Sequence, residues 1–280
     1  MLRLSLVCVL SMAGPALAQD RWMSVPEAAA MPAPASAGTA EVNGIGMHYA
    51  TFGAAVEGRE PVLLIHGGLG HADLWAAQVA DLMKDHLVIV ADSRGHGRSS
   101  RNADTYGYDL MASDYLALLD SLGIAKVDLV GWSDGGIIGL DIAMTHPERI
   151  DRLFAHAANI TVDGVNPAVG TDAVFGAYIT RMGVDYAKMS PTPDDFEAFV
   201  AQISEMWATQ PNWTDAQVAA ITVPVAIVVG EHDEAILPEH TAKIAGLIPG
   251  AELVILPGVS HFAMLQAPGE YTAAVRTFID

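Results

Sequence analysis

Short apolar runs alternate with stretches of helical spacing along most of this chain. The runs lie at 62–65, 86–91, 127–130, 150–157, 223–229 and 252–256, and the helical stretches at 74–83, 110–122, 135–145, 238–247 and 268–279. Such runs are typical of strands that are buried on both faces, as in parallel sheets. The alternation therefore predicts an α/β fold with a mostly parallel sheet, helices on both of its faces and right-handed crossovers.

Three regions depart from this alternation. Residues 19–40 are rich in Ala, Pro, Ser and Gly, which is typical of a flexible leader. Residues 41–52 alternate around Asn43-Gly44 and predict a hairpin. Between 159 and 221, helical pieces are separated by prolines, and we interpret this region as a helical cap inserted after the sixth strand. The remaining core comprises residues 41–158 and 222–280.

The first residues are typical of a secretory signal peptide, with a basic start, an apolar segment over 4–12 and a small-x-small site that ends at Ala18. We predict that residues 1–18 are removed on export, which makes the protein periplasmic or secreted; the alternative is a buried N-terminal helix. The segment is too short to span a bilayer, and the bulky Val7 disfavours lipid attachment at Cys8, so no stable membrane anchor is expected. Because Cys8 is the only cysteine, the mature chain would have no disulfide, catalytic thiol or cysteine-bound metal.

Length and charge narrow the function classes further. The 280 residues suit one α/β domain with an insertion. The formal charge of −19 argues against nucleic-acid binding, which needs a basic surface, and against binding to anionic membranes. An acidic surface mainly gives solubility, so it says little about the substrate. The oligomeric state stays open.

The motif that carries chemistry is Gly131-Trp132-Ser133-Asp134-Gly135, which follows an apolar run and opens a helical stretch. It fits G-x-S-x-G, the nucleophile elbow. A sharp strand-to-helix turn exposes the serine hydroxyl, and the glycines let strand and helix pack closely. The N–H groups at the start of the helix point to where negative charge develops in acyl transfer. Because the chain has 26 glycines, this five-residue pattern could occur by chance, so it is weak evidence for a nucleophile unless other loops supply the partners of the serine.

A serine nucleophile needs a base and an acid that orients the base, and later loops offer both. Asp233 follows the run at 223–229, and His261 follows the run at 252–256. The carboxyl ends of parallel strands meet at one edge of a sheet. We therefore expect Ser133, Asp233 and His261 to lie together, in the chain order that accompanies this elbow.

With these motifs the sequence resembles the α/β-hydrolase family over about residues 44–279, and within it the biphenyl hydrolase-like and valacyclovirase-like esterases. Residues 92–99, Asp-Ser-Arg-Gly-His-Gly-Arg-Ser, also match the family's loop after its fourth strand. The resemblance implies an eight-stranded sheet, Ser133 as nucleophile, His261 as general base and acid, and Asp233 as the carboxylate that holds the imidazole.

The resemblance leaves the acid partly open. Some family members take it from the loop after the sixth strand, where this chain offers Asn159 and Asp163. Asp233 itself is crowded by Glu231, His232 and Glu234. The residue before the histidine is usually glycine in the family and is Ser260 here, a departure that does not affect the base.

Two backbone N–H groups are expected to form the oxyanion hole: that of Asp134 and that of Gly68, with Gly67 as the alternative. The Asp134 side chain either points outward at the helix N-terminus or attracts a cationic substrate. The residues expected to line the substrate pocket, beside some aromatic residues of the cap, are Leu69, Trp132, Phe262 and Met264.

The other polar clusters are interpreted as structural. We expect His66 to support its loop, and Asp92, Arg94 and His96 to form a buried network. Residues 231–234 hold His, Asp and Glu together, but adjacent residues rarely converge on one ion and no H-E-x-x-H helix accompanies them, so no metal is expected.

These residues predict an exported serine hydrolase that cleaves small or medium apolar carboxylic esters through an acyl-enzyme, without a cofactor. Lactonase, C–C bond hydrolase, perhydrolase and acyltransferase activities use the same triad and remain alternatives, as does a non-catalytic ligand-binding protein. Haloalkane dehalogenase and epoxide hydrolase are excluded because both need a carboxylate nucleophile where Ser133 stands. The natural substrate stays open.

Overall fold

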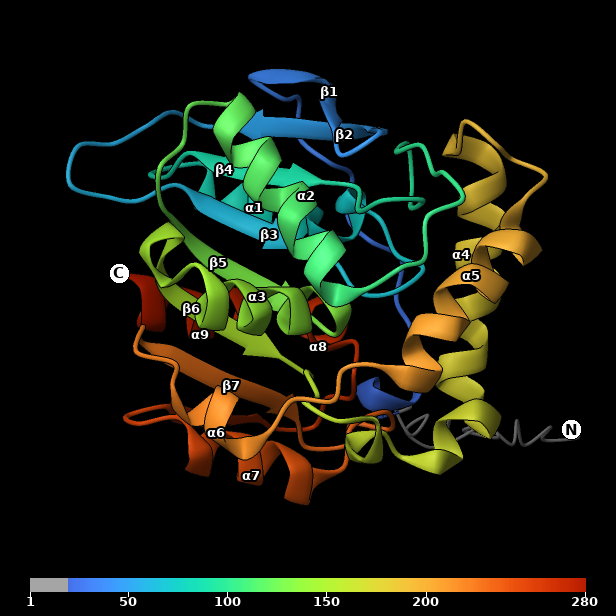
Figure 1. Cartoon of the computed structure of the whole chain (residues 1–280), viewed down its shortest axis with the longest axis vertical. Helices are drawn as coiled ribbons and strands as arrows, with labels where there is room; N and C mark the ends of the chain where they lie inside the picture. Colours follow the sequence, from blue (N-terminus) through green and yellow to red (C-terminus); the bar gives the residue numbers. More distant parts are fainter. Residues whose placement is uncertain (1–19) are drawn as a thin grey trace, which may run out of the picture.

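A sheet of eight strands runs through the centre of the molecule (Figure 1). The computed structural model describes residues 20–280, so the predicted signal peptide lies outside the described residues. The strands are β1 (Ser36–Val42), β2 (Ile45–Phe52), β3 (Val62–Ile65), β4 (Val88–Ala91), β5 (Val127–Trp132), β6 (Ile150–His156), β7 (Val225–Gly230) and β8 (Glu252–Leu256). Their order is β1-β2-β4-β3-β5-β6-β7-β8, antiparallel from β1 to β4 and parallel beyond. The predicted mostly parallel, eight-stranded sheet is confirmed.

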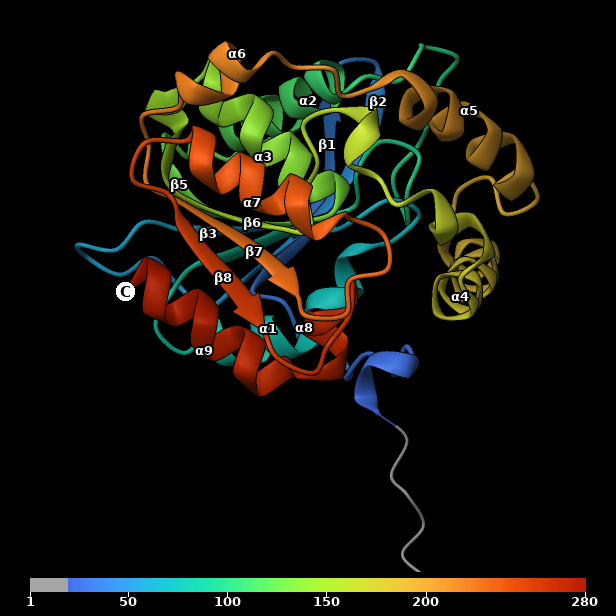
Figure 2. The ribbon, with the colours of Figure 1, turned by 90° about the horizontal axis from the view of Figure 1, so that it is seen from below.

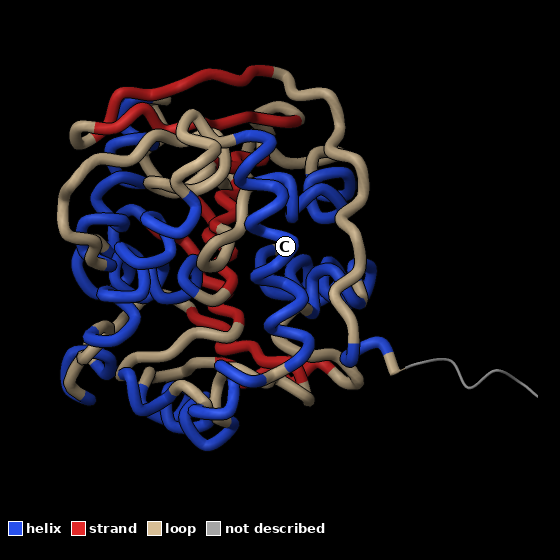
Figure 3. Tube along the Cα trace, turned by 90° about the vertical axis from the view of Figure 1, so that its right-hand side faces the viewer, coloured by secondary structure: helices blue, strands red, loops and turns tan. Residues whose placement is uncertain are grey.

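Helices cover both faces of this sheet. On one face lie α1 (Ala76–Leu82) and α9 (Pro268–Ile279), and on the other α2 (Tyr108–Ser121), α3 (Asp134–Thr145) and α7 (Pro238–Leu247) (Figure 2). Seen from the side, the strands lie between the two helical layers (Figure 3). Strands β3, β4, β5 and β7 are buried along their whole length, which explains their nearly continuous apolar sequences. None of the helices within residues 20–280 combines the length and apolar character needed to cross a bilayer.

Two long helices, α4 (Ala173–Met189) and α5 (Phe196–Thr209), lie beyond the carboxyl ends of the strands (Figure 1). Both belong to the predicted insertion at 159–221. The third helix of the insertion, α6 (Asp215–Ala219), packs against α3 and α7 within the helical layer of the core. The short helices are η1 (Arg21–Met23), η2 (Ala72–Trp75), η3 (Pro147–Arg149), η4 (Val162–Gly164), η5 (Pro167–Thr171) and α8 (Ala263–Gln266).

The prediction of a flexible leader at 19–40 is wrong for the described part of that range. Strand β1 begins at Ser36 and pairs with β2 around a turn in which Asn43 and Gly44 have φ of 43° and 78°, which confirms the hairpin. Residues 20–35 precede β1, and apolar side chains among them pack against the core. Composition misled here because the contacts of this segment are with residues far along the chain, such as Gly258.

Candidate active site

Ser133 lies at a strained turn between β5 and α3. Its φ of 54° and ψ of −119° are unfavourable for a residue with a side chain, and such strain is typical of functional turns. Gly131 and Gly135 make the turn possible: a Cβ on Gly131 would collide with the backbone of Gly135, and one on Gly135 with the Ile65 carbonyl. The turn thus places Ser133 on the wall of a cavity at the carboxyl ends of the strands.

His261 and Asp233 form a buried pair beside this serine. They lie in the loops after β8 and β7, and His261 Nδ1 is 3.1 Å from both carboxylate oxygens of Asp233. The carboxylate also accepts hydrogen bonds from the backbone N–H groups of Ala235 (2.9 Å) and Ile236 (2.8 Å). His261 lines the same cavity as Ser133. The structure therefore brings together the three residues expected from the sequence.

The pair shifts both pKa values toward the charged forms. Burial acts to lower the pKa of His261, but the charge and hydrogen bond of Asp233, with the nearby carboxylates of Glu234 and Asp134, raise it above its ordinary value. Burial acts to raise the pKa of Asp233, but His261 and the Ile236 N–H hold it below its ordinary value. Asp233 is thus ionised at neutral pH and fixes a proton on Nδ1 of His261, which leaves Nε2 as the basic nitrogen.

The other candidates for the acid have different contacts. Asn159 lines the cavity and donates through its amide to the Thr161 carbonyl (3.0 Å). Glu234 accepts from the backbone N–H of His261 (3.1 Å), and Glu231 accepts from that of Gly258 (2.8 Å). The two glutamates that flank Asp233 therefore bond to the backbone of the histidine loop. No local sequence pattern indicates that these two glutamates would hydrogen-bond to the loop that carries His261.

Gly68 and Asp134, the expected oxyanion donors, line the cavity next to Ser133. Asp134 begins α3, so its N–H has no acceptor within the helix. The Gly68 carbonyl accepts from the hydroxyl of Tyr178 in α4 (2.8 Å), which fixes the following peptide. Gly67, the alternative, does not line the cavity, and its carbonyl accepts from Gly70 N (3.1 Å) and faces His66 Nδ1 at 2.8 Å.

The Asp134 side chain is buried and points inward rather than into solvent. Its carboxylate accepts from the Tyr108 hydroxyl (2.8 Å) and from Trp207 Nε1 (3.0 and 3.1 Å). Burial raises its pKa, and these hydrogen bonds oppose that rise. Because Tyr108 belongs to α2 and Trp207 to α5, the carboxylate joins the elbow to both the core and the cap.

The cavity has a volume of about 480 Å³ and a mainly apolar wall. Leu69 and Trp132 line it as expected, but Phe262 and Met264 do not. Phe262 is fully buried, with its ring 4.8 Å from that of Tyr178, and Met264 is fully buried in α8. The expectation for these two residues is wrong because the chain turns inward directly after His261. The cavity wall also includes residues that the sequence did not indicate, among them Val162, Val165, Val169, Ile236 and Gln210.

Two comparisons relate this architecture to known proteins. A sequence model described as the alpha/beta hydrolase fold matches residues 60–189. The solved structure of the enol-lactonase from Burkholderia xenovorans LB400 superposes with a TM-score of 0.68 at 25% identity, covering 86% of this chain and 99% of that one. The chain belongs to the α/β-hydrolase fold family.

Relatives of this α/β-hydrolase also carry hydrolase names. One from Caulobacter vibrioides (strain NA1000 / CB15N), named "Putative carbamate hydrolase RutD", is 28% identical over 84% of this chain and 96% of its own length. The mouse protein named "Serine hydrolase BPHL" is 27% identical over 85% of this chain and 84% of its own. With the family match, these relatives identify the chain as a hydrolase enzyme.

His66 and Arg94 of this α/β-hydrolase have structural contacts. The Nε2 atom of His66 accepts from Ser93 N at 3.0 Å, and the Arg94 guanidinium pairs with Asp114 at 2.8 Å, so both residues hold their loops. Within residues 20–280, no group of His, Cys, Asp and Glu side chains is arranged to hold a metal ion.

Proposed function

We propose that this hydrolase is exported and cleaves small or medium apolar carboxylic esters through an acyl-enzyme intermediate. The observation that carries the proposal is the shared cavity: Ser133 on its strained turn and His261, held by Asp233, line one apolar space of about 480 Å³. That volume is within the range of small-molecule sites. The composition of the wall favours apolar groups on either side of the ester.

The proposed mechanism begins when Ser133 Oγ attacks the ester carbonyl while His261 Nε2 takes its proton. Asp233 stays ionised and stabilises the imidazolium. The N–H groups of Gly68 and Asp134 receive the oxyanion, and one such donor contributes about 2.7–4 kcal/mol to transition-state stabilisation. His261 then protonates the leaving alcohol. The same histidine activates a water molecule that releases the acid and restores Ser133.

Hydrolysis of lactones is the second candidate. Lactones are cyclic esters and would react by the same steps, and the enol-lactonase from Burkholderia xenovorans LB400 is matched over almost its whole length. The name of the Caulobacter relative adds carbamates to the substrates worth testing. C–C bond hydrolysis, perhydrolysis and acyl transfer would use the same triad. Export is supported by the basic, apolar and small-residue pattern of residues 1–18.

The test compares the wild-type enzyme with Ser133→Ala on p-nitrophenyl esters of increasing chain length, beside lactones, carbamates and amino-acid esters. We expect the wild type to be labelled by a fluorophosphonate and to prefer short or medium acyl chains. The variant should lose turnover and labelling and keep its melting temperature. Undiminished ester hydrolysis by the variant would contradict the mechanism.

Mass spectrometry of the exported wild type should find a chain that begins after Ala18; a chain retained with Met1 would contradict export.

A further inference from the structure

The segment 20–31, here called the N-terminal strap, lies against the loop that carries His261. Its helix η1 packs beside α8, directly after that loop (Figure 2). Val25, Ala28 and Met31 of the strap pack against the core. The strap is therefore part of the fold at the edge of the sheet where the candidate site lies.

Arg21 fixes the strap to the start of the histidine loop. Its guanidinium donates to two successive carbonyls, those of Pro257 (2.7 Å) and Gly258 (2.9 Å). It also forms a two-point ion pair with Glu270 of α9, at 2.7 and 2.9 Å. One side chain thus joins the strap to the backbone of the loop and to the helix that follows it.

Gln266 fixes the strap to the residue directly before His261. Its buried amide Nε2 donates to the Ser24 carbonyl (2.8 Å) and to the Ser260 hydroxyl (2.9 Å). Its Oε1 accepts from the backbone N–H of Ser260 at 2.7 Å. Gln266 therefore hydrogen-bonds both to the backbone of the strap and to that of Ser260. A displacement of the strap would be transmitted to Ser260 through this side chain.

The strap also contacts the acid loop and the cap. The Trp22 ring stacks on that of His232, the residue before Asp233, with centroids 4.5 Å apart. The Pro26 carbonyl accepts from Arg181 of α4 at 2.7 Å. Of all these contacts, those of Arg21 and Gln266 bear most directly on the histidine loop.

We propose that the N-terminal strap is a positioning element for His261, with Arg21 and Gln266 as the positioning residues. The inference rests on the proposed function, in which His261 is the general base. Reacting groups must be held within a narrow range of distance and angle, and a displacement of about 1 Å can cost up to about 100-fold in rate. The strap limits the displacement of the His261 loop without touching the substrate cavity.

Two variants test the proposal, Arg21→Ala and Gln266→Glu. Gln266→Glu keeps the acceptor for Ser260 N but loses the donor to Ser24 and to the Ser260 hydroxyl, and it covers the case in which Arg21→Ala does not fold. We expect kcat, normalised to the sites titrated by a fluorophosphonate, to fall about tenfold. KM should stay unchanged because the cavity wall is intact. Arg21→Lys, which can still donate to one carbonyl, should restore part of kcat.

Arg149→Ala is the matched control. Arg149 also donates to two successive carbonyls, those of Ile124 (3.0 Å) and Ala125 (2.7 Å), and pairs with the exposed Asp120 at 2.9 Å. It lies at the amino ends of β5 and β6, away from the site. Its loss should lower stability as much as Arg21→Ala does and leave kcat unchanged.

The outcomes separate the two proposals. A lower kcat in Arg21→Ala and Gln266→Glu than in Arg149→Ala, with rescue by Arg21→Lys, supports the strap. Equal kcat in the strap and control variants would overturn it, as would a loss explained by the unfolded fraction. Persistent turnover in Ser133→Ala would instead overturn the proposed function.

Discussion

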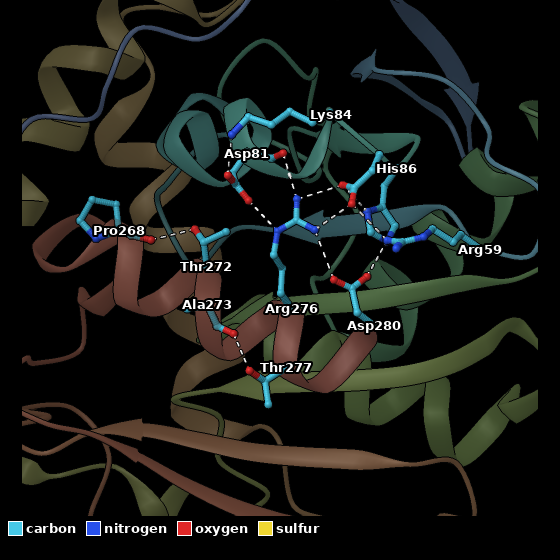
Figure 4. Close-up of polar contacts among 11 residues, drawn as sticks. Arg59, Asp81, Lys84, His86, Pro268, Thr272, Ala273, Arg276, Thr277 and Asp280 are labelled. Atoms are coloured by element: carbon cyan, nitrogen blue, oxygen red, sulfur yellow. Dashed lines mark hydrogen bonds and ion pairs between the residues drawn. The ribbon is translucent and has the colours of Figure 1, made fainter.

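Two charged clusters lie at opposite ends of the sheet and are built differently. At the carboxyl ends, the side chains of His261 and Asp233 are each 2% exposed. Near the amino ends of β3 and β4, Arg276 contacts Asp81, Asp85 and Asp280 in a cluster whose side chains are 25–40% exposed (Figure 4).

Within residues 20–280, Asp233 is the one carboxylate that hydrogen-bonds to the imidazole of His261. In the exposed cluster, by contrast, a second cation contacts the same carboxylates. Arg59 also bonds to Asp85 (3.3 Å) and Asp280 (2.6 Å), so these carboxylates keep a cation if Arg276 is lost. Water screens the exposed charges but is excluded from the buried pair. Both clusters have charged groups at similar distances, yet only the buried one includes His261, the residue that we propose as general base.

The largest effect is expected from Asp233→Asn. An amide would no longer hold a proton on Nδ1 of His261, and the base would adopt the wrong tautomer. We expect kcat for ester hydrolysis to fall about 10⁴-fold while the fold is retained. Asp280→Asn, the same change in the exposed cluster, is the control and should leave kcat unaltered. A kcat for Asp233→Asn within tenfold of the wild type would show that another group supplies the acid.

Much of this buried site could be predicted because local sequence patterns specify it. The bounds of β3, α7, β8 and α9 match the expected ranges, and α7 and α9 each begin at a proline, which suits the first helical turn. The Ser133 turn needs glycines at fixed offsets, and parallel strands bring their carboxyl ends to one edge. Local signals thus locate the residues proposed for catalysis.

The rest depended on contacts that no local pattern contains. The strap has the composition of a leader, but Arg21 bonds to a carbonyl 237 residues away. Phe262 and Met264 follow the expected base in sequence, but the inward turn into α8 takes them out of the cavity. Asp134 has three hydrogen-bond contacts, from side chains of α2 and α5 that spacing could not bring together. Tertiary packing decides such cases.

A second, smaller effect is the pH dependence of the buried pair. Protonated His261 cannot take the proton of Ser133, so kcat/KM should fall as pH drops through the pKa of this histidine. Because Asp233 outweighs burial, that pKa lies above its ordinary value of about 6.5. The neighbouring His156, whose pKa burial lowers to about 3, stays neutral throughout this range.

The measurement is kcat/KM from pH 5 to 9 at low and high salt, with Asp85→Asn as the control from the exposed cluster. We expect the acidic side of the kcat/KM profile to give an apparent pKa above about 6.5. Because the pair is buried, this apparent pKa should change little with salt, and it should be the same in the control. A limb at or below the ordinary histidine value would mean that burial outweighs the carboxylate.

The smallest effect is expected from Arg276→Ala. The guanidinium makes contacts of 2.6 Å to Asp81 and 2.9 Å to Asp85, but solvent screens them and Arg59 remains. We expect the free energy of unfolding to fall by about 1 kcal/mol, which lowers the melting temperature by about 2–4 °C. The difference should shrink in 1 M NaCl, and kcat should not change. A decrease of several kcal/mol in the free energy of unfolding that persists in high salt would mean that this cluster, too, behaves as a buried one. Exposure would then no longer explain the contrast between the two ends of the sheet.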